Sequence, residues 1–258
     1  MSSYDHVIVE RRDAFTTIVM NLPERRNALS RAHLRELLDA FRRAGESDAR
    51  GIILAGNGPV FSAGHDLGEV RGADLVAARE LLVTCEELML TIVGIPQPVV
   101  ARVHALATAA GCQLVAACDL AVAADSAGFA IPGGKGGWFC HTPLVAVARN
   151  VGRKRAAEMA LTGDTIDAAT ALEWGLVNRV VPAAELERET LALLERATRG
   201  SALSKGLGKD GFYHQIDLDL RQAYAYATEL MAAASQTADA QEGMASFLEK
   251  RPPKWTNR

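Results

Sequence analysis

The sequence predicts an α/β fold, on two observations. Short apolar runs typical of buried strands alternate with longer segments of helical periodicity. The order strand, small-residue turn, helix also occurs twice, at residues 51–93 and 99–118. No strand pattern follows residue 203, and 258 residues suffice for one large core with a small appendage. We therefore expect a core over residues 1–200 and, over 201–258, a helical subdomain or an oligomerisation element.

The N-terminal elements follow from local patterns. Two β-branched runs, at residues 7–10 and 15–20, are separated by RRDA, which predicts a hairpin. Ser30 is a suitable cap for the helix that comes next. The apolar positions of that helix fall on one face: Leu34, Leu37, Leu38 and Phe41.

The central elements are bounded by turn residues. A short buried strand is expected at residues 51–56, followed by the glycine-rich turn NGPVFSAGHDLGEV. A helix fits residues 73–93 and stops at GIPQP, because proline cannot continue a helix. Further strands are expected at 99–103 and 120–123, on either side of an alanine-rich segment.

The C-terminal part is mainly helical. Two short amphipathic helices are expected at residues 153–164 and 167–176, a strand at 177–182, and a helix at 183–199. Beyond these, we expect long helices separated by the segments GKDGF and SQTADAQEG.

Composition excludes several classes of function. The net charge of −3 gives no positive field to attract nucleic acid or an anionic membrane. The apolar run at 105–124 contains Gln113 and Asp119, so it is a core segment rather than a membrane span. The four cysteines show no CxxC pairing, which favours reduced thiols in a cytoplasmic protein without a structural metal. The N-terminus shows no secretory pattern, and no dinucleotide fingerprint is complete.

Five motifs in a fixed order carry a resemblance to a known family. They are NALS at 27–30, FSAGHDL at 61–67, AAGCQLVAACDLAVAADSAGFAIP at 109–132, LTGDTIDAATALEWGLVNRVVP at 161–182 and EGMASFLEKRPPKW at 242–255. The chain resembles the enoyl-CoA hydratase/isomerase (crotonase) superfamily over nearly its whole length. The resemblance implies a spiral of repeated ββα units and a helical C-terminal trimerisation region, giving a homotrimer or a dimer of trimers. It also implies an acyl-CoA thioester substrate, so coenzyme A is part of the substrate and no separate cofactor is expected.

The same resemblance implies an oxyanion hole. The thioester carbonyl becomes an enolate during reaction, and two backbone N–H groups stabilise its negative oxygen. By resemblance these belong to His65 and Ala110. Independently, a helix N-terminus has free N–H groups and small residues let a ligand approach the backbone. Further residues are implied to contact the substrate or its coenzyme A: Arg26 (toward the phosphates), Ala63, Asp66, Leu67, Gly133 and Trp138.

The chain departs from the family at the catalytic positions. In hydratases that it resembles, two glutamates hold the water, and here Gln113 and Gly133 stand at those positions. An amide does not cycle a proton at neutral pH, and glycine has no side chain. Gln113 is expected to face the thioester pocket, the alternative being a buried amide satisfied by backbone groups.

The segment GGKGGWFCHTP, residues 133–143, is a second departure. His141 is a candidate acid or base, because histidine is the side chain most often used for proton transfer near neutral pH. Cys140 is a candidate nucleophile if His141 or a helix N-terminus stabilises its thiolate. Adjacent residues rarely face each other, so a Cys-His pair that arises by chance stays an alternative. Trp138 and Phe139 favour a short or planar acyl group.

Three functions are compatible with these features. The first is an acyl-CoA enzyme of this family, an isomerase, hydrolase or lyase with an atypical acid or base. The second is a genuine enoyl-CoA hydratase of fatty-acid metabolism, in which Gln113, backbone groups and His141 position the water. The third is a non-catalytic acyl-CoA-binding protein.

Overall fold

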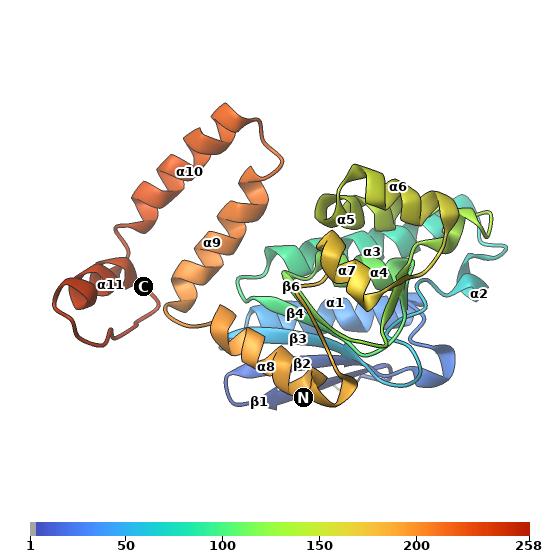
Figure 1. Cartoon of the computed structure of the whole chain (residues 1–258), viewed down its shortest axis with the longest axis horizontal. Helices are drawn as coiled ribbons and strands as arrows, with labels where there is room; N and C mark the ends of the chain where they lie inside the picture. Colours follow the sequence, from blue (N-terminus) through green and yellow to red (C-terminus); the bar gives the residue numbers. More distant parts are fainter. Residues whose placement is uncertain (1–3) are drawn as a thin grey trace.

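The computed structural model describes residues 4–258 and contains a main sheet of six strands (Figure 1). Strand β1 pairs with β2 in antiparallel orientation, and every later pair in this sheet is parallel. The predicted α/β class and N-terminal hairpin are confirmed. In sheet order the strands are β1 (Val7–Arg12), β2 (Phe15–Met20), β3 (Gly51–Gly56), β4 (Val99–Val103), β6 (Leu120–Ala124) and β9 (Arg179–Val181).

A second, three-stranded sheet was not predicted. Its strands are β5 (Ala107–Thr108), β7 (Gly128–Ala130) and β8 (Ile166–Asp167). Runs of two or three residues are too short to show a period of two in the sequence. The small sheet matters for function because β5 leads directly into helix α4.

Eight α-helices of the described chain belong to the core, and four of them begin with a side-chain cap. The Ser30 hydroxyl accepts the His33 N–H at 3.2 Å, as expected of a cap, and the apolar face predicted for this helix is buried. Helix α5 was not predicted. The core helices are α1 (Arg31–Gly45), α2 (Leu67–Val70), α3 (Leu75–Gly94), α4 (Ala110–Ala117), α5 (His141–Val151), α6 (Arg153–Thr162), α7 (Ala168–Trp174) and α8 (Leu186–Ala197).

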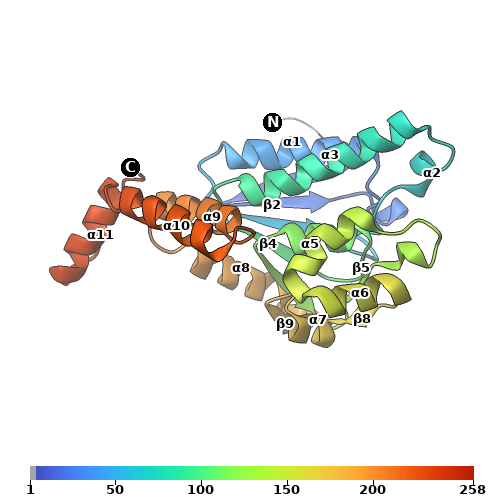
Figure 2. The ribbon, with the colours of Figure 1, turned by 90° about the horizontal axis from the view of Figure 1, so that it is seen from above.

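Both faces of the main sheet are covered by helices. Along β3, Ile52 and Leu54 belong to the larger core cluster, whereas Ile53 packs with Val100 and with Leu194 of α8. Side chains alternate between the faces of a strand, so a strand buried on both faces is apolar at nearly every position. Figure 2 shows α8 on the opposite side of the sheet from α1 and α3.

The C-terminal helices form an arm that projects from the core (Figures 1 and 2). The expected break at GKDGF is wrong, because α9 continues through it and the chain turns only after Gln215. Gly211 lies where α10 crosses closely, and a Cβ there would overlap Leu230. This glycine therefore serves helix packing, not a turn. The arm consists of α9 (Ala202–Gln215), α10 (Leu220–Ala234) and α11 (Ala238–Leu248), and its status as a separate domain from residue 201 stays a prediction.

A buried ion pair anchors the arm to the core. Lys209 of α9 lies 2.8 Å from the Asp119 carboxylate and also donates to the carbonyls of Ile92 and Gln97. The same carboxylate accepts the Val99 N–H at 2.7 Å. Burial lowers the pKa of Lys209, and the contact with Asp119 opposes that effect. Separately, none of the described helices is long and apolar enough to cross a membrane.

Replacing Lys209 by Met should destabilise the protein by about 3–5 kcal/mol, because it leaves a buried carboxylate without its counter-charge. Urea denaturation measures the change in the free energy of unfolding. Lys205→Met is the matched control, since Lys205 is an exposed lysine of the same helix. Equal losses in the two variants would show that the ion pair does not anchor the arm.

Candidate active site

A cavity of about 520 Å³ opens among three segments of the core. Its walls come from residues 63–67, 108–110 and 132–143, with Leu82 of α3. Eight residues that the sequence indicated line it: Ala63, His65, Leu67, Ala110, Gly133, Trp138, Cys140 and His141.

Several backbone N–H groups in these walls have no partner in residues 4–258, those of Phe139 and Cys140 among them. The N–H of His65 and that of Ala110 donate to no backbone or side-chain acceptor in residues 4–258. Both residues line the cavity. A bridge between Leu29 and His65 uses the Gly64 carbonyl and the Asp66 N–H, which leaves the His65 N–H outside it.

The Ala110 N–H is left without an acceptor in the described residues by an unusual backbone turn. Ala109 has φ 51° and ψ −119°, a conformation that residues with a Cβ rarely adopt. Its own N–H donates to the Ala130 carbonyl at 2.9 Å, so the small sheet holds it in place. Ala110 is the first residue of α4, and the start of a helix has N–H groups without intrahelical partners.

The two donor segments touch so closely that side chains are excluded between them. The Thr108 N–H donates to the Ser62 carbonyl at 3.0 Å. A Cβ on Gly111 would lie 2.5 Å from that carbonyl oxygen. A Cβ on Gly64 would lie 2.9 Å from the Ala109 Cβ and 3.1 Å from the Ala110 nitrogen. Glycine at both positions is therefore a requirement of the site.

Sequence reasoning missed the polar side chains that hold this arrangement. The buried amide of Asn27 donates to the carbonyls of Asn57, Val60 and Phe61 at 2.8–3.1 Å. The Ser62 hydroxyl, also buried, donates to the Asn27 carbonyl at 2.9 Å. Both residues lie inside motifs that were recognised, NALS and FSAGHDL. A polar residue in an otherwise buried segment was the signal available for each.

Gln113 does not line the cavity, although the sequence predicted that it faces the thioester pocket. Its side chain is 5% exposed. It lies one helical turn after Ala109 and Ala110 in α4, behind the donor N–H groups. Gln113 is also not a buried amide whose hydrogen bonds are all formed with backbone groups, because its Oε1 has no hydrogen-bond partner among the described residues.

Gly133 is closed to any side chain. A Cβ there would overlap the Trp138 carbonyl oxygen and lie 2.6 Å from the Cys140 sulfur. Cys140 itself is buried, and burial raises the pKa of its thiol. A nucleophilic cysteine needs a lowered pKa, which stabilises its thiolate. The structure therefore does not support Cys140 as a nucleophile.

The remaining candidates divide between the cavity and its surroundings. His141 is exposed at the start of α5, with its ring 5.1 Å from that of Phe139. Arg26 is exposed and does not line the cavity. The Asp66 carboxylate is already engaged, because it lies 2.7 Å from Arg25 and accepts the Gly68 N–H that begins α2.

One group of possible metal ligands lies elsewhere in the described chain. Single ligand atoms of Asp5, His6 and Glu36 lie within 4.8 Å of one another. The Glu36 carboxylate accepts the backbone N–H groups of Asp5 and His6, which explains the cluster without an ion. The expectation of no metal stays a prediction.

The enoyl-CoA hydratase/isomerase family model matches residues 10–258. The chain belongs to the enoyl-CoA hydratase/isomerase family. The predicted crotonase fold is therefore confirmed, and the match covers both the core and the arm.

Individual members of the family are similar over almost the whole chain. The mouse mitochondrial enoyl-CoA hydratase domain-containing protein 3 is 45% identical over 251 residues, covering 96% of this chain and 83% of that protein. A crystal structure of an enoyl-CoA hydratase from Mycobacterium smegmatis has a TM-score of 0.94 at 44% identity, covering 97% and 98% of the two chains. The human domain-containing protein 3 structure has a TM-score of 0.91 at 43% identity, covering 97% and 100%. Within the family, the chain is therefore similar to the enoyl-CoA hydratase domain-containing protein 3 type.

The mouse relative bears on cellular location. Its name places it in the mitochondrion, which differs from the plain cytoplasmic location expected from the cysteines. The cytoplasmic location of this enoyl-CoA hydratase/isomerase family member therefore stays a prediction.

Gly64→Ala should lower affinity for acyl-CoA at least about tenfold, because the new Cβ displaces the Ala110 N–H by contact. Calorimetric titration with butyryl-CoA measures the affinity. Gly72→Ala is the matched control, since Gly72 has φ +79° against +81° for Gly64 but nothing within 4 Å of an added Cβ. Both variants carry the backbone strain, and only Gly64→Ala carries the contact. Equal affinity losses would contradict the explanation.

Proposed function

We propose that this protein binds acyl-CoA thioesters and stabilises their enolates through the N–H groups of His65 and Ala110. The observation that supports this most is the meeting of two unpartnered N–H groups at one cavity. Hydrogen-bond donors fixed in place before reaction are worth several kcal/mol toward a developing oxyanion. The strain at Ala109 is the cost of this fixation, about 1–3 kcal/mol.

The chemistry we propose is isomerase- or lyase-like rather than hydration by paired glutamates. The family resemblance puts the two glutamates of a hydratase at Gln113 and Gly133, and neither residue here transfers a proton. The space at Gly133 is filled by the Trp138 carbonyl and the Cys140 sulfur. A reaction that needs an enolate and one proton-transfer group fits this site better than one that needs two carboxylates.

The cavity favours a small acyl group. Its walls include Trp138 and Phe139, whose rings restrict the space beside the donor N–H groups. Leu67 and Leu82 supply apolar surface on another wall. Arg26 remains the proposed contact for coenzyme A phosphates, because its side chain is exposed and forms no ion pair within the described residues. No further cofactor is proposed.

Two other functions have specific support. Hydration is favoured by the names of similar proteins, several of which are described as enoyl-CoA hydratases. Binding without turnover is favoured by the raised pKa of Cys140 and the closed position at Gly133. The following measurement separates hydration from the other two functions.

Crotonyl-CoA should bind to the purified protein, but its hydration should be much slower than in ordinary enzymes, which turn over about 1–1000 times per second. Calorimetry measures binding, and loss of the enoyl absorbance measures hydration in the same sample. An ordinary rate would show that hydration proceeds without the two glutamates. Absence of binding would contradict the proposed function as a whole.

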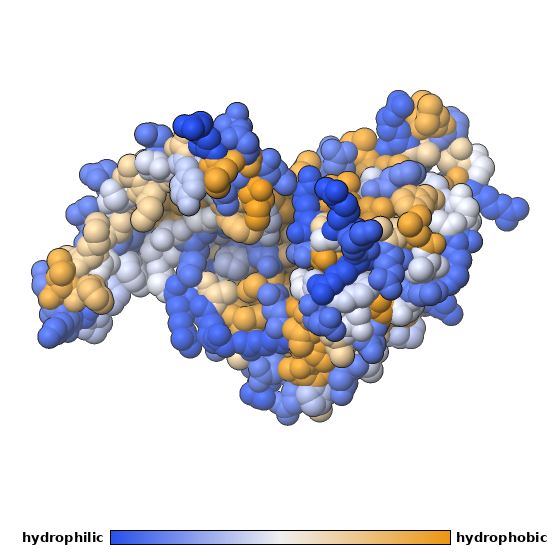
Figure 3. Space-filling model, turned by 45° about the horizontal axis from the view of Figure 1, so that its top comes forward, coloured by the Kyte–Doolittle hydropathy of each residue, from blue (hydrophilic) through white to orange (hydrophobic). Residues whose placement is uncertain are grey.

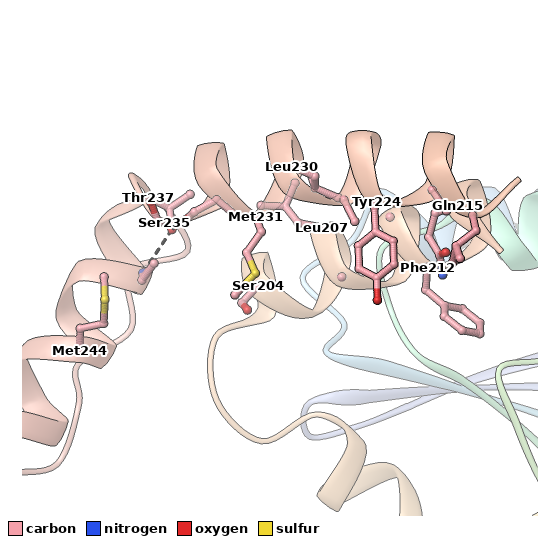
Figure 4. Close-up of a pocket in the computed structure, with 17 residues that line it drawn as sticks. Ser204, Leu207, Phe212, Gln215, Tyr224, Leu230, Met231, Ser235, Thr237 and Met244 are labelled. Atoms are coloured by element: carbon pink, nitrogen blue, oxygen red, sulfur yellow. Dashed lines mark hydrogen bonds between the residues drawn. The ribbon is translucent and has the colours of Figure 1, made fainter. Parts of the chain in front are cut away.

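We also propose that the arm assembles the protein into a homotrimer or a dimer of trimers. Phe212 of α9 and Tyr224 and Met231 of α10 are exposed and line an apolar groove (Figure 4). Figure 3 shows further hydrophobic surface on the arm. Contiguous exposed apolar surface of this kind is typical of protein interfaces, and Met231 is 79% exposed in the single chain.

Met231→Lys should weaken assembly, because it puts a charge into an apolar interface. Light scattering after gel filtration should give about three or six chains for the wild type and a smaller particle for the variant at low concentration. Glu195→Lys, which changes an exposed residue of α8, is the control for altered charge. A wild-type monomer would contradict the assembly.

A further inference from the structure

The side chain of His65 has a feature that its backbone role does not explain. Both ring nitrogens, Nδ1 and Nε2, are buried and have no hydrogen-bond partner within residues 4–258. The ring lies 6.0 Å from that of Trp138, and both residues line the cavity. A buried donor or acceptor without a partner costs about 1–3 kcal/mol. An imidazole with a purely structural role therefore normally forms a hydrogen bond through at least one ring nitrogen.

We propose that the His65 imidazole is the proton-transfer group of this site, an assignment that rests on the proposed thioester binding. One ring nitrogen takes a proton from the carbon next to the thioester carbonyl. The C–H electron pair moves into the enolate, whose oxygen is held by the N–H groups of His65 and Ala110. The imidazolium then returns its proton to the same carbon, or to the γ-carbon of an unsaturated acyl chain. No oxidant, reductant or second substrate is required.

The position of His65 fits this role. Its own backbone N–H is one of the two proposed oxyanion donors. A thioester oxygen bound to that N–H is therefore held by the same residue that carries the imidazole. The carbon next to the carbonyl is two bonds from that oxygen. The same residue therefore brings together the group that stabilises negative charge and the group that accepts the proton.

The other titratable groups in the cavity wall fit less well. Lys135 is engaged with Asp164 at 2.8 Å. The Cys140 thiol has a pKa raised by burial. His141 is exposed at the start of α5. Among the titratable groups that line the cavity, only His65 is an imidazole whose two ring nitrogens are both buried and without a hydrogen-bond partner in the described residues.

The electrostatic environment keeps this imidazole ready to accept a proton. Burial lowers the pKa of His65; the Leu29 carbonyl, which lies near the ring but outside hydrogen-bond geometry, opposes this shift to a smaller extent. The ring is therefore neutral at pH 7, which is the form that a general base requires. A base of this kind loses activity only when the pH falls below its lowered pKa.

Hydrogen exchange in butyryl-CoA tests the assignment, because this saturated thioester forms an enolate but does not add water. The full-length protein is incubated with butyryl-CoA in D2O, and mass spectrometry follows deuterium incorporation at C2. Wild-type protein should catalyse the exchange. His65→Gln should slow it by at least about 100-fold, with affinity for butyryl-CoA changed by less than about threefold, because the backbone N–H remains.

Three comparisons make the test specific. His65→Asn is a second variant in case the first does not fold, as judged by circular dichroism. His141→Gln removes the exposed imidazole of the same cavity and should slow the exchange much less than His65→Gln does. His104→Gln is the control outside the cavity, since that ring bonds the Gly58 carbonyl at 2.9 Å.

The pH dependence of wild-type exchange gives an independent readout. The rate should be constant above the ordinary histidine pKa of 6.5 and should fall only below it. A structural role for the ring predicts no such profile. An apparent pKa at or above 6.5 would overturn the assignment of His65.

The outcomes distinguish this inference from the proposed function. Undiminished exchange in folded His65 variants overturns the inference and leaves enolate formation intact. Loss of exchange in His141→Gln alone transfers the role to His141. Wild-type protein that binds butyryl-CoA without exchange overturns the inference while thioester binding stands. Failure to bind overturns the proposed function itself.

Discussion

The candidate site depends on the close approach of two backbone segments, residues 61–65 and 106–111. Gly64 and Gly111 leave no space for a Cβ, and the Ser62 carbonyl accepts the Thr108 N–H across the contact. If either segment moved away, the N–H groups of His65 and Ala110 would no longer serve one cavity. Only a surrounding core that is closely packed fixes a backbone contact of this kind, since local propensity does not favour the conformation of Ala109.

The polar interactions behind this contact explain why it is stable. Asn27 donates to three carbonyls of residues 57–61, and Ser62 in turn donates to the Asn27 carbonyl. Hydrogen bonds among buried groups are costly to leave incomplete, so this network fixes the loop in one conformation. The opposite applies at His65 and Gln113, where buried side-chain atoms have no partner in the described chain. Of the two, only His65 lines the cavity, and a buried polar group without a partner at a cavity is typical of a binding site rather than of a finished core.

The 133–143 segment decides whether a side chain fits at Gly133, the position where the family resemblance implies a glutamate. From the sequence, Gly133 is a position where a side chain has been lost. In the structure the position is occupied, because the Trp138 carbonyl and the Cys140 sulfur fill the space where a side chain would begin. The segment also contributes Trp138, which lies beside His65. The filled space at Gly133 and the His65 imidazole thus belong to the walls of one cavity.

The sequence alone determined the α/β class, the main strands, the helix capped by Ser30, and the residues whose backbone meets in the cavity, since these follow from local periodicity and from ordered motifs. It did not determine the small sheet, the continuous α9, the roles of Asn27 and Ser62, or the separation of Gln113 from the cavity. Gly211 illustrates the reason: the sequence indicates a turn, whereas contact with Leu230 makes it a packing position. Local patterns report the preference of a segment for helix, strand or turn. The partners of a buried amide, the space at a glycine and the neighbours of an imidazole are set by segments far apart in the chain, which only the tertiary structure brings together.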